Sequence, residues 1–266
     1  MKYFFVYSPK DLAGRNMANY LKELFNFEKE DNFYVYNNFY IVETKIHPIY
    51  ADFLENIIKD GIILVLSKHT SEKRIKSITA HTPGNWTKFN DYGGKKESVS
   101  VANPILQTIF IRKAYENNKF EDFEVTFEVT HHGPSINLPI TFFEIGSSEE
   151  DWKREDIARF IVDMILDSLK DFEKIIKKEN KICLGIGGPH YAPKFTKFVL
   201  ENKDYYIGHM IPKYVFNEIN LNKMIPQGIE KSFPKVNTVL IDKKGVKAHI
   251  RERVKEIVTD ISIELI

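Results

Sequence analysis

The chain has 266 residues, of which 43% are apolar, and its 38 Lys and Arg residues nearly balance 37 Asp and Glu residues. The resulting net charge of +1 argues against a protein that coats nucleic acid non-specifically, although it allows a local basic patch. The single cysteine, Cys183, excludes an intramolecular disulfide and a four-cysteine zinc site.

Strand-like and helix-like patterns alternate along the first half of the chain. Tyr3–Tyr7 is typical of a buried strand, and Ser8–Asp11 resembles a capping box that opens a helix to about Phe25. We expect a hairpin next, with strands at 33–36 and 39–44 and a turn at residues 37–38. A helix at 52–59 and a buried strand at 62–66 should follow it.

The segment 67–104 lacks apolar periodicity and is rich in Ser, Thr, Gly, Asn and Lys. A loop of this length is uncommon in a compact domain unless it is functional, so we expect a long functional loop here. Helix-strand alternation then resumes. The expected helices are 104–116, 152–178, 194–201, 214–223 and 250–259, and the expected strands are 123–130, 140–145, 182–185, 205–210 and 239–242.

This alternation predicts an α/β fold of three layers, α/β/α, around a mostly parallel mixed sheet. We expect one domain over residues 1–266, acting as a monomer. The longest apolar run in the middle of the chain, Ile62–Leu66, is far shorter than the roughly 20 residues of a membrane span. With no signal-peptide pattern at the N-terminus, these features predict a soluble, cytoplasmic protein.

Histidines follow several of the predicted strands. His69 comes after the strand at 62–66, His190 after that at 182–185, and His209 lies near the end of that at 205–210. His81 lies inside the long loop, whereas His47 and His249 fall outside the pattern. Ligands of open α/β sheets bind beyond the carboxyl ends of the strands, so these imidazoles are candidates for a shared metal or acid-base site.

The sharpest motif is Glu128–Pro134, in which His131 and His132 end a predicted strand. Gly133 permits a turn there, so both imidazoles can face one crevice and act as a ligand and a proton donor. Glu128 lies an even number of residues before His132, which suits a carboxylate that orients an imidazole. Glu144, late in the strand at 140–145, is a further candidate ligand.

Three other features are candidates for substrate binding. Gly187 and Gly188 lie in a turn before His190 and Tyr191, where backbone amides can approach an anion or oxyanion. Trp86, in the polar loop, either stacks on a base or pins the loop to the core. Lys68 precedes His69 and offers a positive charge at the same strand end.

Four motifs together resemble the archaeal type of D-aminoacyl-tRNA deacylase, which also occurs in plants. They are Ser-Lys-His-Thr-Ser at 67–71, Ala-His-Thr-Pro-Gly-Asn at 80–85, Glu-Val-Thr-His-His-Gly-Pro at 128–134, and Gly-Gly-Pro-His-Tyr-Ala-Pro-Lys-Phe-Thr at 187–196. The resemblance runs along the whole chain in the same order. It implies a phosphorylase/hydrolase-like fold and an enzyme that hydrolyses the ester between a D-amino acid, such as D-tyrosine, and tRNA.

The resemblance also implies zinc as the cofactor. We expect the metal on some of His69, His81, His131, His190 and Glu144, with His131, His132 and Glu128 as the catalytic group. Two alternatives remain open from the sequence. One is a zinc-dependent amidohydrolase or peptidase that acts on a small substrate, and the other is a tRNA-binding module without catalysis.

Overall fold

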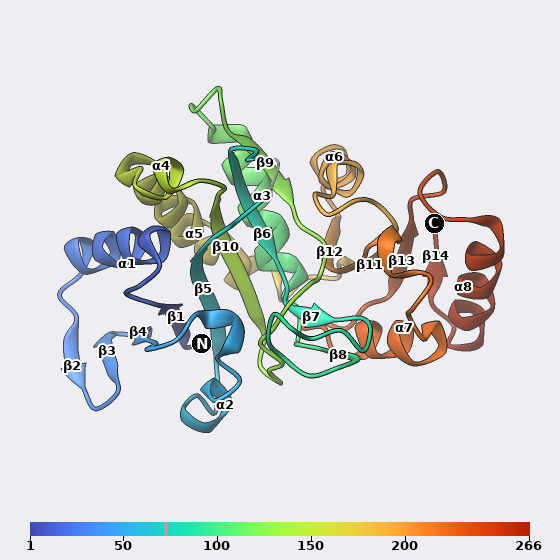
Figure 1. Cartoon of the computed structure of the whole chain (residues 1–266), viewed down its shortest axis with the longest axis horizontal. Coiled ribbons are helices and arrows are strands. Elements are labelled where there is room, and N and C mark those ends of the chain that lie inside the picture. The colour runs from blue at the N-terminus through green and yellow to red at the C-terminus, as the bar shows by residue number, and fades with distance from the viewer. Residues whose placement is uncertain (72–73) are drawn as a thin grey trace.

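The computed structural model describes residues 1–71 and 74–266, and it confirms an α/β fold with a mixed, mostly parallel sheet. The described strands form two main sheets and a separate two-stranded pair rather than the single sheet expected. Eight strands pair in the order β2-β3-β4-β1-β5-β10-β6-β9, and four pair as β12-β11-β13-β14. The two sheets lie side by side along the long axis of the molecule (Figure 1).

The larger sheet has a parallel centre. β1 (Tyr3–Tyr7) pairs in parallel with β4 (Phe39–Glu43) and with β5 (Ile62–Lys68), and β5 pairs in parallel with β10 (Ile140–Gly146). β1 and most of β5 are buried, which explains their continuous apolar runs. The predicted hairpin is confirmed, because β3 (Phe33–Tyr36) pairs antiparallel with β4, and β2 (Glu28–Glu30) extends it.

The segment 67–104 is not one loop. It contains β6 (Ser77–His81), which inserts into the larger sheet antiparallel to β10 and parallel to β9 (Glu124–Phe127). It also contains the small pair β7 (Gly84–Asn85) and β8 (Ser98–Val99). β6 was missed because Ser77, Thr79 and His81 alternate with Ile78 and Ala80, so that most of its buried residues are small or polar. Residues 72–73 lie outside the described part of this segment.

Several helices begin or end elsewhere than expected. Asp11, not Ser8, caps α1 (Leu12–Leu24), since its carboxylate accepts from the Gly14 amide. The predicted helix 52–59 shrinks to α2 (Leu54–Ile57). The predicted helix 152–178 is two helices, α4 (Glu149–Trp152) and α5 (Glu155–Ile175), separated by an extended Arg154.

The largest error lies near residue 220. The predicted helix 214–223 is a short 3-10 turn, η2 (Lys213–Val215), followed by α7 (Leu221–Glu230). Pro226 lies inside α7, although proline donates no helical hydrogen bond. Burial of Met224 and Ile225 nevertheless carries the helix through that position.

The remaining elements agree closely with expectation. Asn103 caps α3 (Pro104–Asn117), with proline at the first helical position. The smaller sheet is wholly parallel. Its region contains β11 (Lys181–Ile186), α6 (Pro193–Glu201), β12 (Tyr205–Ile211), β13 (Thr238–Ile241) and α8 (Ala248–Asp260), which follow the predicted alternation apart from the segment near residue 220, and β14 (Glu264–Leu265), which was not predicted. The remaining short element, η1 (Pro48–Tyr50), lies in the N-terminal half between β4 and α2.

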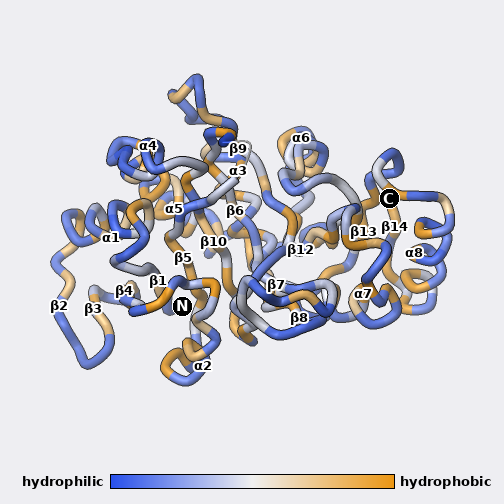
Figure 2. The backbone as a smooth tube through the Cα atoms, viewed as in Figure 1, coloured by the Kyte–Doolittle hydropathy of each residue, from blue (hydrophilic) through white to orange (hydrophobic). Residues whose placement is uncertain are grey.

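The core divides into two parts. A large apolar cluster fills the space between the larger sheet and α1, α3 and α5, and continues into the smaller sheet. A smaller cluster, which includes Val65, Phe142 and Leu54, covers the opposite face under α2. Figure 2 shows the apolar strands at the centre and hydrophilic outer loops. The face with the smaller cluster leaves room for a cavity beside it.

Candidate metal and catalytic site

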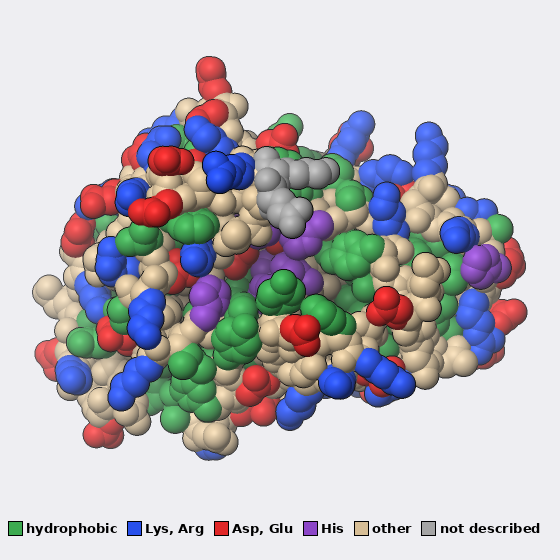
Figure 3. Space-filling model, viewed as in Figure 1, with side chains coloured by type: hydrophobic (Ala, Val, Ile, Leu, Met, Phe, Trp, Pro, Cys, Tyr) green, Lys and Arg blue, Asp and Glu red, His purple; other side chains and the backbone are tan. Residues whose placement is uncertain are grey.

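A cavity of about 600 Å³ opens on this face of the larger sheet. Its walls come from the end of β5, from residues 84–92 and 130–132, from β10, from the turn after β11 and from the segment after β12, together with His47 and Ile49. Figure 3 shows histidines gathered in a hollow near the middle of the molecule. We expected the site to lie beyond the carboxyl ends of the strands. This is only partly right, because His81 and Glu144 lie within β6 and β10, over the sheet itself.

Backbone pairing between the two sheets brings the site together. After β9, Glu128 forms an isolated antiparallel bridge with Tyr191, and the Val129 amide donates to the His190 carbonyl at 2.9 Å. The Thr130 amide likewise donates to the Met210 carbonyl at 3.0 Å. β9 thus ends at Phe127 rather than at Thr130, because the next residues leave the larger sheet to pair with the smaller one.

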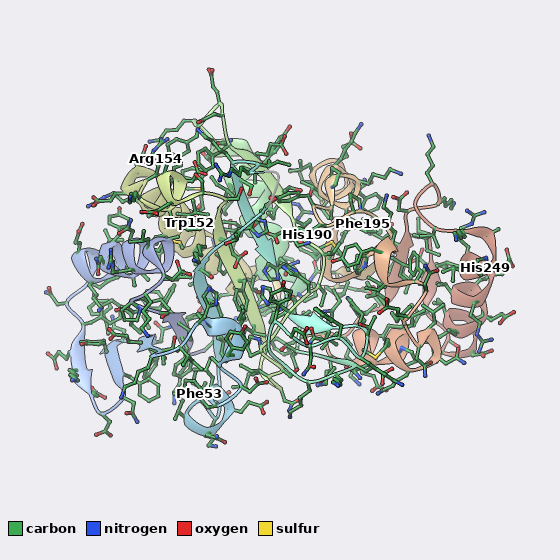
Figure 4. All side chains as sticks on the ribbon, viewed as in Figure 1. Phe53, Trp152, Arg154, His190, Phe195 and His249 are labelled. Atoms are coloured by element: carbon green, nitrogen blue, oxygen red, sulfur yellow. The ribbon has the colours of Figure 1, made fainter. Side chains whose placement is uncertain are left out.

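Glu128 is the hub of the first half of the site. Its fully buried Oε2 lies 2.9 Å from Nε2 of His190, 3.1 Å from Nδ1 of His69 and 3.5 Å from Nε2 of His131. His190 reaches this point from the turn after β11 (Figure 4). Three imidazoles from three separate segments therefore converge on one carboxylate oxygen.

Glu144 is the hub of the second half. Its Oε2 lies 3.4 Å from Nδ1 of His69 and 3.6 Å from Nε2 of His81. The His81 ring stacks on Phe142, with centroids 5.1 Å apart, and lies 4.9 Å from the ring of His132. His69 therefore contacts both carboxylates and links the two halves.

Backbone carbonyls set the tautomers of the paired histidines. Nδ1 of His131 donates to the Val129 carbonyl at 2.8 Å, and Nδ1 of His132 donates to the Gly133 carbonyl at 2.6 Å. Each ring then presents an unprotonated Nε2. Metal-binding histidines are commonly oriented in this way. The prediction that both neighbours face one crevice is confirmed, and His132 reaches it with a positive φ of 44°.

The carboxylates dominate the electrostatics. Burial raises the pKa of Glu128, but His69 and His190 outweigh it and hold that pKa well below its usual range. Burial lowers the pKa of His69, yet the two carboxylates raise it to about 11. Burial and the nearby charge of His81 lower the pKa of His132 to about 3. Glu128 and Glu144 therefore remain negatively charged although they are buried, and positive charge beside them is stabilising.

Its donor set fits a divalent metal. Three groups have ligand atoms within 4.8 Å of one another among the described residues: His81, His131 and His132; His69, Glu128 and His190; and His81, Glu128 and Glu144. Ligands at about 2.0–2.1 Å around a tetrahedral zinc lie about 3.3 Å apart, close to the separations seen here. Nε2 of His69, both ring nitrogens of His81 and both oxygens of Glu128 are buried without a well-oriented hydrogen bond.

Comparison with known proteins supplies the family. The sequence profile described as D-aminoacyl-tRNA deacylase matches residues 58–266. The chain belongs to this family. D-aminoacyl-tRNA deacylases of Methanocaldococcus jannaschii and Pyrococcus furiosus are each 35% identical to it, over 99% and 96% of this chain and 98% and 96% of their own.

A solved crystal structure supports the same fold. It is described as a conserved protein of unknown function, shares 31% sequence identity, and covers 99% of this chain and 94% of its own with a TM-score of 0.88. Membership of the D-aminoacyl-tRNA deacylase family thus extends over the whole chain, including the segments that carry the histidine cluster.

The structure brings together every predicted metal and catalytic residue of this deacylase. His69, His131, His132, His190 and Glu144 line one cavity. His81 and Glu128 are fully buried behind its wall, within ion-pair distance of Glu144 and His190 respectively. His209 does not join them. It is buried behind Trp86, where its ring nitrogens bond to Thr130 and to the Ser100 and Lys231 carbonyls. His249 lies exposed on α8, at the edge of the molecule (Figure 4).

The predicted substrate-binding residues differ in where they lie relative to the cavity. Lys68 lines the cavity, where its Nζ lies 4.4 Å from the ring centroid of Trp152. Trp86 is 2% exposed and donates from Nε1 to the Met210 carbonyl, so it pins its segment to the core and forms part of the cavity wall. Tyr191 packs 5.5 Å from the ring of His69.

The glycine turn serves a different purpose from the one expected. Gly187 and Gly188 do not line the cavity, and the Gly187 amide already donates to the Ile211 carbonyl at 2.8 Å. That amide is therefore not free to bind an oxyanion. Both glycines have a positive φ, of 112° and 86°, which lets the turn place His190 over Glu128.

Several cavity residues were missed by the sequence reasoning. His47, treated there as an outlier, lines the cavity and has its Nε2 3.8 Å from a carboxylate oxygen of Asp11. Phe89, Tyr92 and Tyr214 also line it. A lone histidine and scattered aromatic residues carry no local motif, so only the tertiary structure could identify them.

Proposed function

We propose that this chain hydrolyses the ester between a D-amino acid and tRNA at the histidine cavity, with a zinc ion bound there. The observation that carries the proposal is the convergence of five imidazoles and two buried carboxylates in one cluster, of which four imidazoles and Glu144 line the cavity. Family membership supports the substrate, since the matched relatives are named for this activity. The chemistry of the donor set supports the metal.

Two groups of residues are suited to hold the metal. His69, Glu128 and His190 supply two imidazoles and a carboxylate, while His81, His131 and His132 supply three imidazoles, and both combinations occur in catalytic zinc sites. Softer thiolate ligands are absent, because Cys183 is buried in β11. When bound, zinc would polarise the ester carbonyl and lower the pKa of a bound water to about 7.

The side chains of the protein account for the remaining steps. Water attacks the ester carbonyl, the acyl C–O bond breaks, and the ribose hydroxyl leaves with a proton. Where the metal is held by His69, Glu128 and His190, the unprotonated Nε2 of His132 is free to accept a hydrogen bond from the attacking water and orient it, because its Nδ1 donates to the Gly133 carbonyl. Lys68 and His47, on the cavity wall, are placed to contact the polar part of the substrate.

A chiral hydrolysis assay with a chelator tests the proposal. We expect release of D-tyrosine from D-tyrosyl-tRNA, much slower release of L-tyrosine from L-tyrosyl-tRNA, and loss of both after chelation, with recovery on adding zinc. A substrate with many phosphates also predicts rates that fall steeply with salt, unlike those of a hydrolase for small neutral substrates. Equal rates on the two enantiomers would remove the proofreading function.

Glu128→Gln provides the sharper test of the site. It keeps the size of the side chain but removes the charge that three imidazoles share, so we expect zinc affinity and deacylation to fall by at least about tenfold. Glu124→Gln is the matched control, since Glu124 is an exposed glutamate at the start of β9, four residues before Glu128. Full activity of Glu128→Gln with its fold intact would refute the assignment.

The setting of the reaction is also a proposal. A tRNA substrate places the reaction in the cytoplasm, and we propose that the chain acts there as a monomer, because one chain supplies the whole histidine cluster. None of the helices among the described residues is long and apolar enough to cross a membrane. Sedimentation of the zinc-loaded protein at assay concentrations tests the oligomeric state.

A further inference from the structure

Three aromatic side chains line the cavity and are unusually exposed. Phe89 is 53% exposed, Tyr92 61% and Tyr214 53%. We call Phe89, Tyr92 and Tyr214 the aromatic rim. Large rings usually lie in the core, so exposed rings beside a binding cavity point to a ligand. Figure 3 shows hydrophobic side chains directly beside the histidines of the hollow.

The backbone that carries Phe89 and Tyr92 is firmly held. The Asn85 side chain donates to the Gly93 carbonyl at 2.8 Å, and the Lys95 amide donates to the Ser135 hydroxyl at 2.8 Å. The Tyr92 carbonyl accepts from the Gly133 amide at 3.0 Å, next to His132. This half of the aromatic rim is therefore anchored to the segment that carries the paired histidines.

Tyr214 is anchored to the other side of the site. It lies in η2, where the Lys213 amide donates to the Gly188 carbonyl at 2.9 Å, two residues before His190. The two parts of the aromatic rim thus extend from the two backbone segments that hold His132 and His190. A preformed platform of this kind loses little entropy when a flat ligand stacks on it.

Positive charge accompanies the aromatic rim. Lys88 precedes Phe89 and Lys213 precedes Tyr214, and both are exposed. Within residues 1–71 and 74–266, neither lysine has a carboxylate within ion-pair distance, although Asp91 lies in the same turn as Lys88. Aromatic faces interleaved with free lysines are typical of surfaces that bind single-stranded nucleic acid.

We propose that the aromatic rim stacks the unpaired bases at the 3′ end of tRNA, beginning with the terminal adenine. This inference rests on the proposed function. The scissile ester is on the terminal ribose, so once its carbonyl reaches the histidine cluster the attached base must lie against a wall of the same cavity. Phe89, Tyr92 and Tyr214 supply stacking faces on that wall, and Lys88 and Lys213 lie beside the path of the phosphates.

Binding of uncharged RNA tests the proposal without catalysis. Fluorescence anisotropy would measure the Kd of a hairpin RNA with an unpaired 3′ CCA end, and of the same hairpin with a blunt end. We expect Phe89→Ala and Tyr214→Ala each to weaken binding of the CCA hairpin by about fivefold or more, and to leave the weak binding of the blunt hairpin unchanged. Phe89→Tyr and Tyr214→Phe should retain wild-type affinity, because the stacking face remains.

Tyr115→Ala is the matched control. Tyr115 is 57% exposed, like the aromatic rim, but it lies near the end of α3 and does not line the cavity. Its substitution should leave both affinities unchanged. Equal binding of the CCA hairpin by the wild type and by both alanine variants of the aromatic rim would overturn the proposal.

A kinetic comparison separates base stacking from binding of the amino acid. With D-tyrosyl-tRNA and D-alanyl-tRNA, Tyr214→Ala should raise KM by a similar factor for both substrates, since both carry the same terminal adenine. A rise confined to D-tyrosyl-tRNA would show that the aromatic rim holds the amino-acid side chain, and would refute the proposal. Selective CCA binding without any deacylation would instead leave the aromatic rim supported and remove the proposed function.

Discussion

Replacement of His209 by Gln should change how the stability of the protein depends on pH. His209 is completely buried, and burial lowers its pKa to about 4, against hydrogen bonds to the Ser100 and Lys231 carbonyls that raise it. Its Nε2 donates to those carbonyls, while Nδ1 accepts from the Thr130 hydroxyl. The folded protein thus uses a neutral imidazole.

The sign and size follow from proton linkage. In the unfolded chain this histidine titrates near 6.5, so between pH 6.5 and 4 the unfolded state binds a proton that the folded state rejects. Stability is therefore lost as the pH falls through this window. The penalty reaches about 2 kcal/mol at pH 5 and about 3 kcal/mol below pH 4, at about 1.4 kcal/mol for each unit.

Urea denaturation of the chelated protein between pH 7.5 and 5 measures this effect. At pH 7.5 we expect His209→Gln to be less stable than the wild type by about 1–2 kcal/mol, because its hydrogen bonds are less well placed. Toward pH 5 that deficit should shrink or reverse. His249→Gln, at an exposed position, should follow the wild type throughout. If the free energy of unfolding changed with pH in the same way for the wild type and for His209→Gln, the reasoning would be refuted.

Three further predictions concern the metal, the cavity wall and the turns. Chelation should lower Tm by about 5 °C or more, with recovery on adding zinc in a thermal melt, since binding to the folded state alone stabilises it; an unchanged Tm would argue against a tightly bound metal. Trp86→Ala should cost about 3–5 kcal/mol in urea denaturation, because the indole is buried against His209, and a cost below 1 kcal/mol would contradict its anchoring role. Gly93→Ala should destabilise the fold more than Gly188→Ala does. Both have a positive φ, but a Cβ at Gly93 would lie 2.0 Å from the Ile49 carbonyl oxygen, whereas at Gly188 the nearest atom is 3.9 Å away; equal costs in denaturation would show that backbone strain alone decides.

Some of the fold follows from local sequence. Buried parallel strands such as β1 and β5 are continuous apolar runs, which indicate them in the sequence. The start of α3 is likewise indicated locally, by Asn103-Pro104. β6 could not be recognised in this way. Its residues Ser77–His81 are buried, but most of them are small or polar, so their burial depends on β10 and β9 as neighbours.

The sequence also identified the candidate residues of the site. His69, His81, His131 and His190 lie within short, distinctive motifs, and their side chains are suited to a metal whatever the fold. What the sequence did not determine was their arrangement. Glu128 was expected to orient an imidazole within the catalytic group. In the structure, its Oε2 is the atom on which three histidines converge.

Only the tertiary structure decided that arrangement, and the physical reason is backbone pairing over long separations in the chain. Hydrogen bonds between the segment after β9 and the turns of the smaller sheet bring Glu128 to His190, and insertion of β6 beside β10 brings His81 to Glu144. The aromatic rim stays exposed at the cavity, whereas His209 is buried behind Trp86. Local residue patterns indicate which side chains can form the site, whereas contacts between distant segments determine how those side chains are arranged.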